Sequence, residues 1–135
     1  MLKKISLLAI LGVFLSFSAL AVPNEAEFGL CLKKNATDAG LTECYKKETE
    51  VVKKEIKTLE NALQPIAIAD SVTITSLNGF ISEYIKSYCD YYILAHRGDG
   101  YSTNFHSAKC YMLGYMQYYR DLQSLYGLSI SDIKE

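Results

Sequence analysis

The stretch Leu41–Leu63, LTECYKKETEVVKKEIKTLENAL, decides the fold class of this chain. One row of its positions recurs every three or four residues, which is the period of an α-helix. The row consists of Leu41, Cys44 or Tyr45, Glu48, Val52, Ile56, Leu59 and Leu63. The other faces carry lysines and glutamates and are interpreted as solvated. The stretch therefore predicts a long amphipathic helix, which Pro65 ends because proline lacks a backbone N–H.

Shorter elements are expected on either side of this helix. Asn24–Lys34 predicts a short, partly buried helix, and the turn-forming residues Asn35–Gly40 separate it from the long one. Downstream, Asp70 or Ser71 is a suitable N-cap, although the β-branched residues that follow would also fit a strand. The later residues favour a helix up to Ala95, with a stripe made by Leu77, Ile81, Tyr84, Tyr88, Tyr91 and Ala95.

A break rich in turn formers, His96–Gly100, precedes the last predicted helix. That helix is expected from about Ser102 to Tyr126, with Gly127 as the residue that terminates it. Leu128–Glu135 is then a short tail, with one more helical turn after Ser129 as the alternative. The predicted fold is all-α, a single up-down bundle of three main helices and a short N-terminal one, with its core at about 28–126.

The N-terminus has the pattern of a cleavable signal peptide. A cationic start, Met1–Lys4, precedes an apolar run from Ile5 to about Phe17, and Ser18–Ala21 supplies the small residues that a signal peptidase accepts. A membrane anchor is the alternative, but no later apolar stretch reaches the roughly 20 residues that span a bilayer. We therefore expect residues 1–21 to be removed and 22–135 to form one periplasmic or secreted bacterial domain without stable membrane insertion.

All four cysteines lie in this expected mature part, at Cys31, Cys44, Cys89 and Cys110. An even number in a small exported chain is typical of a disulfide framework. Metal binding is the alternative, but no C-x-x-C or H-x-x-x-H motif occurs, and the two histidines stand alone in the sequence. Of the three connectivities we favour Cys31–Cys44 with Cys89–Cys110, because both loops are local. Each closure would stabilise the fold by about 3 kcal/mol.

Charge and residue pattern argue against several classes of function. Without the two lysines of the signal, 12 basic residues face 15 acidic ones, a net charge of about −3. The chain thus lacks the basic surface that nucleic acid requires. Its carboxylates are scattered among lysines, with no apolar setting that would raise a pKa for acid–base catalysis. His106 has no evident partner and is expected at the surface or at a helix start. No enzyme, metal or cofactor is predicted.

Eleven tyrosines and no tryptophan make the second half of the chain aromatic. At helical spacing, most of these rings are expected in the core or at its rim, with their hydroxyls in water. Tyrosine is also favoured at protein interfaces, because it supplies a large area with little entropy to lose. An exposed subset would therefore form a surface for another protein or an apolar ligand.

Several blocks of the chain resemble a known family over about Phe28–Leu125. They are TDAGLTECYKKE at 37–48, FISEYIKSYC at 80–89, the glycine-containing loop at 97–102, and CYMLGYMQYYRDL at 110–122. With their four cysteines they resemble the small exported lysozyme inhibitor LprI-like domains. The chain departs from the usual family residues around the third and fourth cysteines, where it carries Asn78, Ile81, Ile85, Tyr115 and Tyr118.

The resemblance implies an exported, non-catalytic protein that blocks a lysozyme cleft lined by two carboxylates. The binding element would be the loop His96–Asn104. In it, Arg97 would pair with a carboxylate. The other residues expected to contact the partner are His96, Tyr101, Ser102 and Thr103. A mildly acidic body would suit a basic lysozyme.

Overall fold

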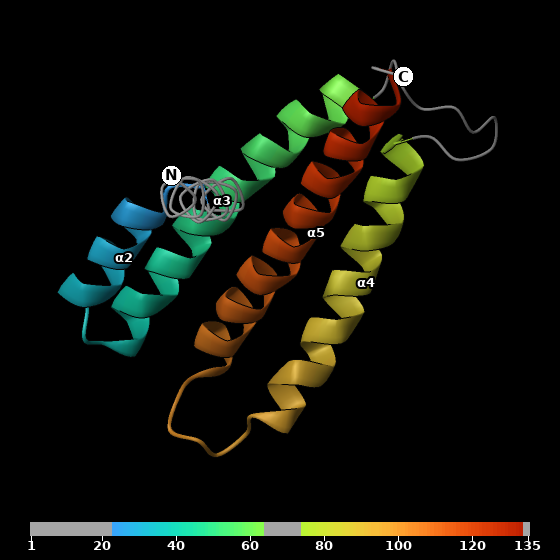
Figure 1. Ribbon diagram of the computed structural model, residues 1–135. Coiled ribbons are helices and arrows are strands. Elements are labelled where there is room, and N and C mark those ends of the chain that lie inside the picture. The colour runs from blue at the N-terminus through green and yellow to red at the C-terminus, as the bar shows by residue number, and fades with distance from the viewer. Residues whose placement is uncertain (1–22, 64–73, 134–135) are drawn as a thin grey trace, which may run out of the picture.

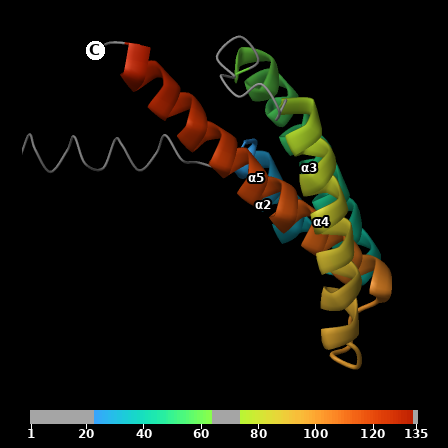
Figure 2. The same ribbon diagram turned by 90° about the vertical axis from the view of Figure 1, so that its right-hand side faces the viewer.

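The computed structural model describes residues 23–63 and 74–133, with side chains placed as far as Gly127. The described residues form four helices, α2 (Glu25–Lys34), α3 (Asp38–Leu63), α4 (Ile74–Ala95) and α5 (Thr103–Ile133). They run alternately down and up, and α5 lies between α3 and α4 (Figures 1 and 2). The predicted all-α bundle, three main helices with a short one before them, is confirmed. None of the described helices is long and apolar enough to cross a membrane.

The predicted signal peptide 1–21, the helix end at Pro65 and the caps at Asp70 or Ser71 all lie outside the described residues.

The main core lies between α3 and α5. The predicted row of α3 is confirmed, because Val52, Ile56 and Leu63 are buried on the side that faces α5. The α5 residues packed against them are Met112, Met116, Tyr118 and Leu122. Leu122 and Val52 are completely buried, so this pair of helices supplies the centre of the fold.

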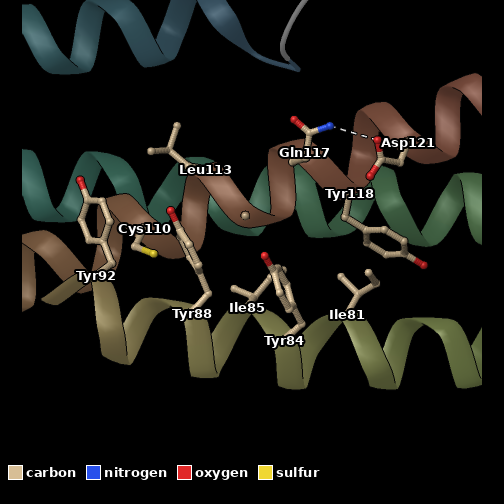
Figure 3. A pocket seen from close by; sticks show the side chains of 11 residues that line it. Ile81, Tyr84, Ile85, Tyr88, Tyr92, Cys110, Leu113, Gln117, Tyr118 and Asp121 are labelled. Atoms are coloured by element: carbon tan, nitrogen blue, oxygen red, sulfur yellow. Dashed lines mark hydrogen bonds between the residues drawn. The ribbon is translucent and has the colours of Figure 1, made fainter. Parts of the chain in front are cut away.

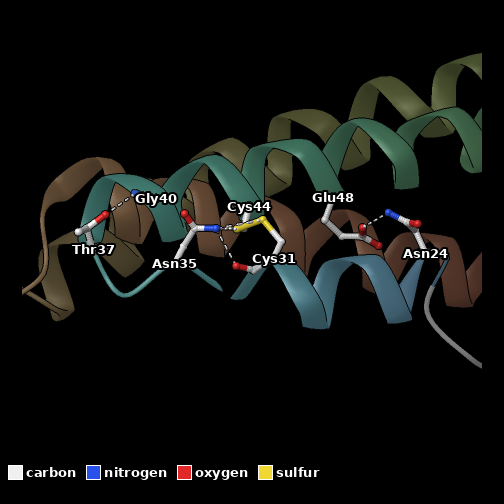
Figure 4. Close-up of a disulfide and its surroundings, with 7 residues drawn as sticks. All are labelled: Asn24, Cys31, Asn35, Thr37, Gly40, Cys44 and Glu48. Carbon is white, nitrogen blue, oxygen red and sulfur yellow. Dashed lines mark hydrogen bonds between the residues drawn. A yellow bond between two sulfur atoms is a disulfide. The ribbon is translucent and has the colours of Figure 1, made fainter. Parts of the chain in front are cut away.

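The first disulfide fastens α2 to α3 (Figure 4). Cys31 and Cys44 are bonded as predicted, while α2 itself has no fully buried residue. The side-chain amide of Asn35 donates a 2.8 Å hydrogen bond to the backbone carbonyl of Cys31 and closes the turn. The Thr37 hydroxyl accepts from the Gly40 amide at 3.1 Å, as an N-cap does. The predicted turn Asn35–Gly40 is thus too long by its last three residues, which form the first turn of α3.

The second disulfide, Cys89–Cys110, joins α4 to α5 in the interior and is also as predicted. Farther along α4, the Asn78 amide donates to both carboxylate oxygens of Glu60, at 2.9 and 3.0 Å. The Tyr118 hydroxyl donates to the same carboxylate at 3.3 Å. This polar cluster connects α3, α4 and α5, and it sets the register of α4 at the end opposite to the disulfide.

The predicted end of the last helix is wrong. Gly127 lies inside α5, which continues to Ile133. A glycine ends a helix when it adopts a left-handed conformation. Among the described glycines only Gly98 and Gly100 have positive φ, at 86° and 93°. Without that conformation a glycine costs a helix about 1 kcal/mol, which does not stop it.

Candidate functional site

The exposed face of α4 is aromatic. Phe80, Tyr84, Tyr88 and Tyr91 are 72, 65, 54 and 76 % exposed, and we call them the tyrosine face. The predicted stripe of α4, which included the three tyrosines, is therefore wrong as a buried face. The residues that α4 buries most are Ile85 and Cys89. The disulfide fixes this rotation, because Cys89 must point at α5.

A groove of about 310 Å³ runs between the tyrosine face and α5 (Figure 3). Tyr84, Tyr88 and Tyr92 project from α4 toward α5 and form one wall (Figure 3). Ile85 and Gly114 both line the groove and approach each other closely, since a Cβ on the glycine would lie 3.0 Å from two Ile85 carbons. The other lining residues are Ile81, Cys110, Leu113, Gln117, Tyr118 and Asp121.

The groove is apolar at its centre and polar at one end. Gln117 donates a 3.0 Å hydrogen bond to Asp121, and this carboxylate is the only one among the lining residues. The Tyr118 hydroxyl is hardly available to a ligand, because it donates a hydrogen bond to Glu60. Burial, with the nearby Glu60 carboxylate, raises the pKa of Tyr118 well above its usual value. The groove therefore suits an apolar ligand with a polar or cationic group at the Asp121 end.

A ladder of rings connects the tyrosine face to the loop between α4 and α5. The ring centroids of Tyr84 and Tyr88 are 6.1 Å apart, and those of Tyr88 and Tyr92 are 6.5 Å apart. The ladder ends where Tyr92 meets His96, with centroids 4.2 Å apart. Residues four apart on a helix lie above one another, so this row follows directly from the spacing 84, 88, 92 and 96.

The α4–α5 loop is held at several points. The Asp99 carboxylate accepts from the Tyr101 amide at 3.1 Å. Asp38, at the start of α3, accepts from the Ser102 amide at 2.7 Å and from its hydroxyl at 2.6 Å. The Ser102 hydroxyl also accepts from the Phe105 amide and so caps α5. The hydrogen bonds from Ser102 lower the pKa of Asp38.

Only part of the predicted binding set has side chains available to a partner. Arg97 and Thr103 are exposed, and Tyr101 is 51 % exposed while it stacks on Phe105. Ser102 uses its hydroxyl within the fold, as just described. His96 is half-buried, because its ring packs on that of Tyr92. Arg97, Tyr101 and Thr103 thus remain as the residues of the loop that a partner would meet first.

His106 lies at a helix start, which is one of its two predicted places, but it is not at the surface and it does have a partner. The residue is buried at 5 % exposure, and its Nε2 lies 2.8 Å from Asp99 Oδ1. His96 Nδ1 lies 3.5 Å from the other Asp99 oxygen. The two histidines that stand alone in the sequence therefore converge on one carboxylate. The hydrogen bond with His106 lowers the pKa of Asp99.

Glu48 contradicts the expectation that no carboxylate lies in an apolar setting. Its residue is 2 % exposed, and its Oε1 has no hydrogen-bond partner. Burial raises its pKa, while a 3.4 Å hydrogen bond from Asn24 opposes the rise. Glu48 lies one turn of α3 beyond Cys44 of the first disulfide (Figure 4). The space that it lines there with Cys31 and Cys44 is only about 20 Å³. That space admits no substrate, so the raised pKa concerns stability.

Comparison of the chain with protein-family models, curated proteins and solved structures found no match. The groove and the cluster of His96, Asp99 and His106, which we call the loop cluster, are therefore interpreted from their own geometry.

Proposed function

We propose that this protein is an exported, non-catalytic binding module that receives an amphipathic helix of a partner protein on the tyrosine face and in the groove. The observation that carries the proposal is the tyrosine face itself, four large aromatic side chains more than half exposed in one row. A monomeric protein rarely exposes so continuous an apolar patch unless the patch binds something. Export is supported by the N-terminal sequence pattern and by two disulfides, which persist in oxidising compartments.

The dimensions favour a helix over a small molecule. From Phe80 to Leu94, both exposed, α4 rises by about 21 Å at 1.5 Å per residue. The groove of about 310 Å³ is at the lower limit for a drug-sized ligand. It covers only part of that length, and the rest of the face lies open. An amphipathic helix with apolar residues at every third or fourth position would cover the whole row.

The charge of the groove indicates the orientation of the partner. Asp121 is the only carboxylate that lines it, so a lysine or arginine at one end of the partner helix would form a charge-assisted hydrogen bond there. The tyrosine hydroxyls and Gln117 supply a polar rim. We expect binding to weaken with added salt only modestly, because a single ion pair contributes little beside the buried aromatic area.

Photocrosslinking in the native host tests this proposal. A benzophenone amino acid at Tyr88 should give a crosslink to a second protein, and Phe80→Ser with Tyr84→Ser should abolish it. The matched control carries the same probe at Leu30, which is 52 % exposed on α2, and should give no such product. A product of twice the mass of the chain would contradict the proposal in favour of self-association. Absence of any product from Tyr88 would also contradict it.

Lysozyme inhibition is a second candidate, favoured by the way the loop is held. Asp38, Asp99 and the α5 cap fix the part of the loop that follows Arg97, which lowers the entropy cost of presenting the loop to a cleft. Micromolar protein should then inhibit lysozyme in a turbidity assay, and Arg97→Ala should weaken inhibition while Lys54→Ala on α3 does not. Absence of inhibition at that concentration would exclude this candidate and leave the groove proposal unaffected.

A further inference from the structure

Three metal-ligating side chains meet at the end of the bundle where α4 passes into α5. They are His96 beyond the end of α4, Asp99 in the loop, and His106 in the first turns of α5. One ligand atom from each lies within 4.8 Å of the others. His96 and Asp99 are partly exposed and His106 is buried, so the cluster is open to solvent on one side only. None of the three residues lines the groove proposed for the partner helix, although Tyr92 contacts both sites.

We propose that His96, Asp99 and His106 bind one divalent transition-metal ion of the Zn²⁺ type. Two imidazoles and one carboxylate are a ligand set that suits Zn²⁺ or Cu²⁺, whereas Mg²⁺ and Ca²⁺ prefer oxygen ligands alone. Three protein ligands leave at least one coordination position for water or for a group of another molecule.

The observed distances require little movement. Zn²⁺ bonds of about 2.0–2.1 Å in tetrahedral geometry place neighbouring ligand atoms roughly 3.3–3.4 Å apart. The contact between His106 Nε2 and Asp99 Oδ1 is 2.8 Å, and that between His96 Nδ1 and Asp99 Oδ2 is 3.5 Å. These two contacts end on different oxygens of Asp99. One ligand atom from each of the three residues lies within 4.8 Å of the others, so only the wider edges of the cluster must close.

The surroundings hold the three ligands near one another before a metal arrives. Tyr92 contacts both imidazoles, with ring centroids 4.2 Å from His96 and 6.1 Å from His106. The two glycines with positive φ shape the loop around Asp99. The Cys89–Cys110 disulfide fixes α4 to α5 close by. Ligands that are already positioned lose less entropy on binding, which favours affinity.

The unpartnered Nδ1 of His106 limits the affinity expected for a metal ion. Metal on Nε2 of His106 leaves the proton on Nδ1, and Nδ1 is buried without a hydrogen-bond partner. Metal-binding histidines usually donate that proton to a neighbouring acceptor, and loss of such an acceptor costs 10–100-fold in affinity. We therefore expect a dissociation constant in the micromolar range.

Zinc titration of the tag-free, disulfide-bonded protein tests the proposal, since the chain contains only these two histidines. Calorimetry should show one Zn²⁺ per chain with micromolar affinity, and Mg²⁺ should give no heat. In heteronuclear NMR, the ring signals of both histidines should shift together. His96→Ala and Asp99→Asn should each weaken binding at least tenfold, and Asp90→Asn on α4, an exposed carboxylate outside the cluster, should leave it unchanged.

The variants are chosen to leave the core intact. His106 is buried, so its replacement risks the fold, whereas His96 and Asp99 are partly exposed and their variants can be checked by circular dichroism. Unchanged ring signals at millimolar zinc would overturn the proposal. So would zinc binding that survives both substitutions, because that result would assign the heat to scattered surface carboxylates.

Discussion

Replacing Gly114 with alanine tests how closely α4 and α5 approach. Gly114 lies on α5, and a Cβ there would stand 3.0 Å from both Cγ1 and Cγ2 of Ile85 and 3.3 Å from its Cδ1. Ile85 is 3 % exposed, and a β-branched side chain in a helix has one strongly preferred rotamer. The isoleucine therefore has no easy way to move aside, and the two helices must separate slightly.

Two opposing terms give the magnitude of this effect. Alanine is favoured over glycine inside a helix by about 0.8–1.0 kcal/mol. An extra carbon forced into a packed interior costs about 1–3 kcal/mol. We expect Gly114→Ala to lower the free energy of unfolding by about 1 kcal/mol, and the packing term decides the sign.

Gly79→Ala is the matched control, because Gly79 lies in α4 with nothing within 4 Å of the position of its Cβ. It should raise the free energy of unfolding by about 0.8–1.0 kcal/mol, the propensity term alone. Urea denaturation followed by circular dichroism measures both variants, and the slope with denaturant should not change. If Gly114→Ala stabilised the protein as much as Gly79→Ala, the close packing of α4 on α5 would be refuted.

Three further predictions concern stability. Glu48→Gln should stabilise the protein at pH 7, because burial raises the pKa of Glu48 and so penalises its ionised form in the fold. The gain should vanish when denaturation is measured below pH about 4.5, because the carboxyl is then protonated in both the folded and the unfolded chain. Asp38→Asn should destabilise at pH 7 but not below the lowered pKa of Asp38, since stability from a depressed carboxyl pKa is lost as the pH falls through it; an equal loss at pH 2 would contradict this. Replacing the cysteines of Cys31–Cys44 or of Cys89–Cys110 by alanine should each cost about 3 kcal/mol on the chain-entropy estimate. In limited proteolysis, α2 should be cut in the variant without Cys31–Cys44 but not in the variant without Cys89–Cys110. The reason is that α2 has only 10 residues and buries none of them, and so short a helix is marginally stable alone.

The sequence is sufficient for the helices and the disulfides but not for the rotation of α4. Val52 and Ile56 are flanked by lysines, so the period of α3 has one interpretation. In α4, a charged row of Glu83, Lys86 and Asp90 leaves most of the helix circumference apolar or aromatic. A row of tyrosines at 84, 88 and 91 therefore fits the helical period as well as the row of Ile81, Ile85 and Cys89 does. The predicted disulfide contained the missing information, because a bonded Cys89 places the residues four and eight before it on the same face.

The loop cluster is a property of the tertiary structure. His96 and His106 are ten residues apart and fit no ligand motif within one helix. They meet because α4 and α5 are antiparallel neighbours, so that the last turn of one lies beside the first turns of the other. Asp99 lies in the connecting loop, whose glycines allow the backbone to turn the carboxylate inward. A sequence search for short motifs does not detect such a site. The signal lay in the predicted helices up to Ala95 and from Ser102, because together they place both histidines near one turn.

The packing of α4 argues that its aromatic face serves an interaction and not the fold. The main core lies between α3 and α5, and α4 is attached to it by the Cys89–Cys110 disulfide, the contact of Ile85 with Gly114 and the hydrogen bonds of Asn78. All three attachments lie on one side of the helix. Tyr84 and Tyr88 also reach toward α5 as a wall of the groove, but both are more than half exposed. Polar residues at these positions would leave the three attachments intact and would improve solubility, since exposed aromatic rings favour aggregation. The exposed rings of Tyr84, Tyr88 and Tyr91 therefore favour aggregation of the unbound protein and add little to the packing of its core. A bound partner helix would cover these rings and remove that disadvantage.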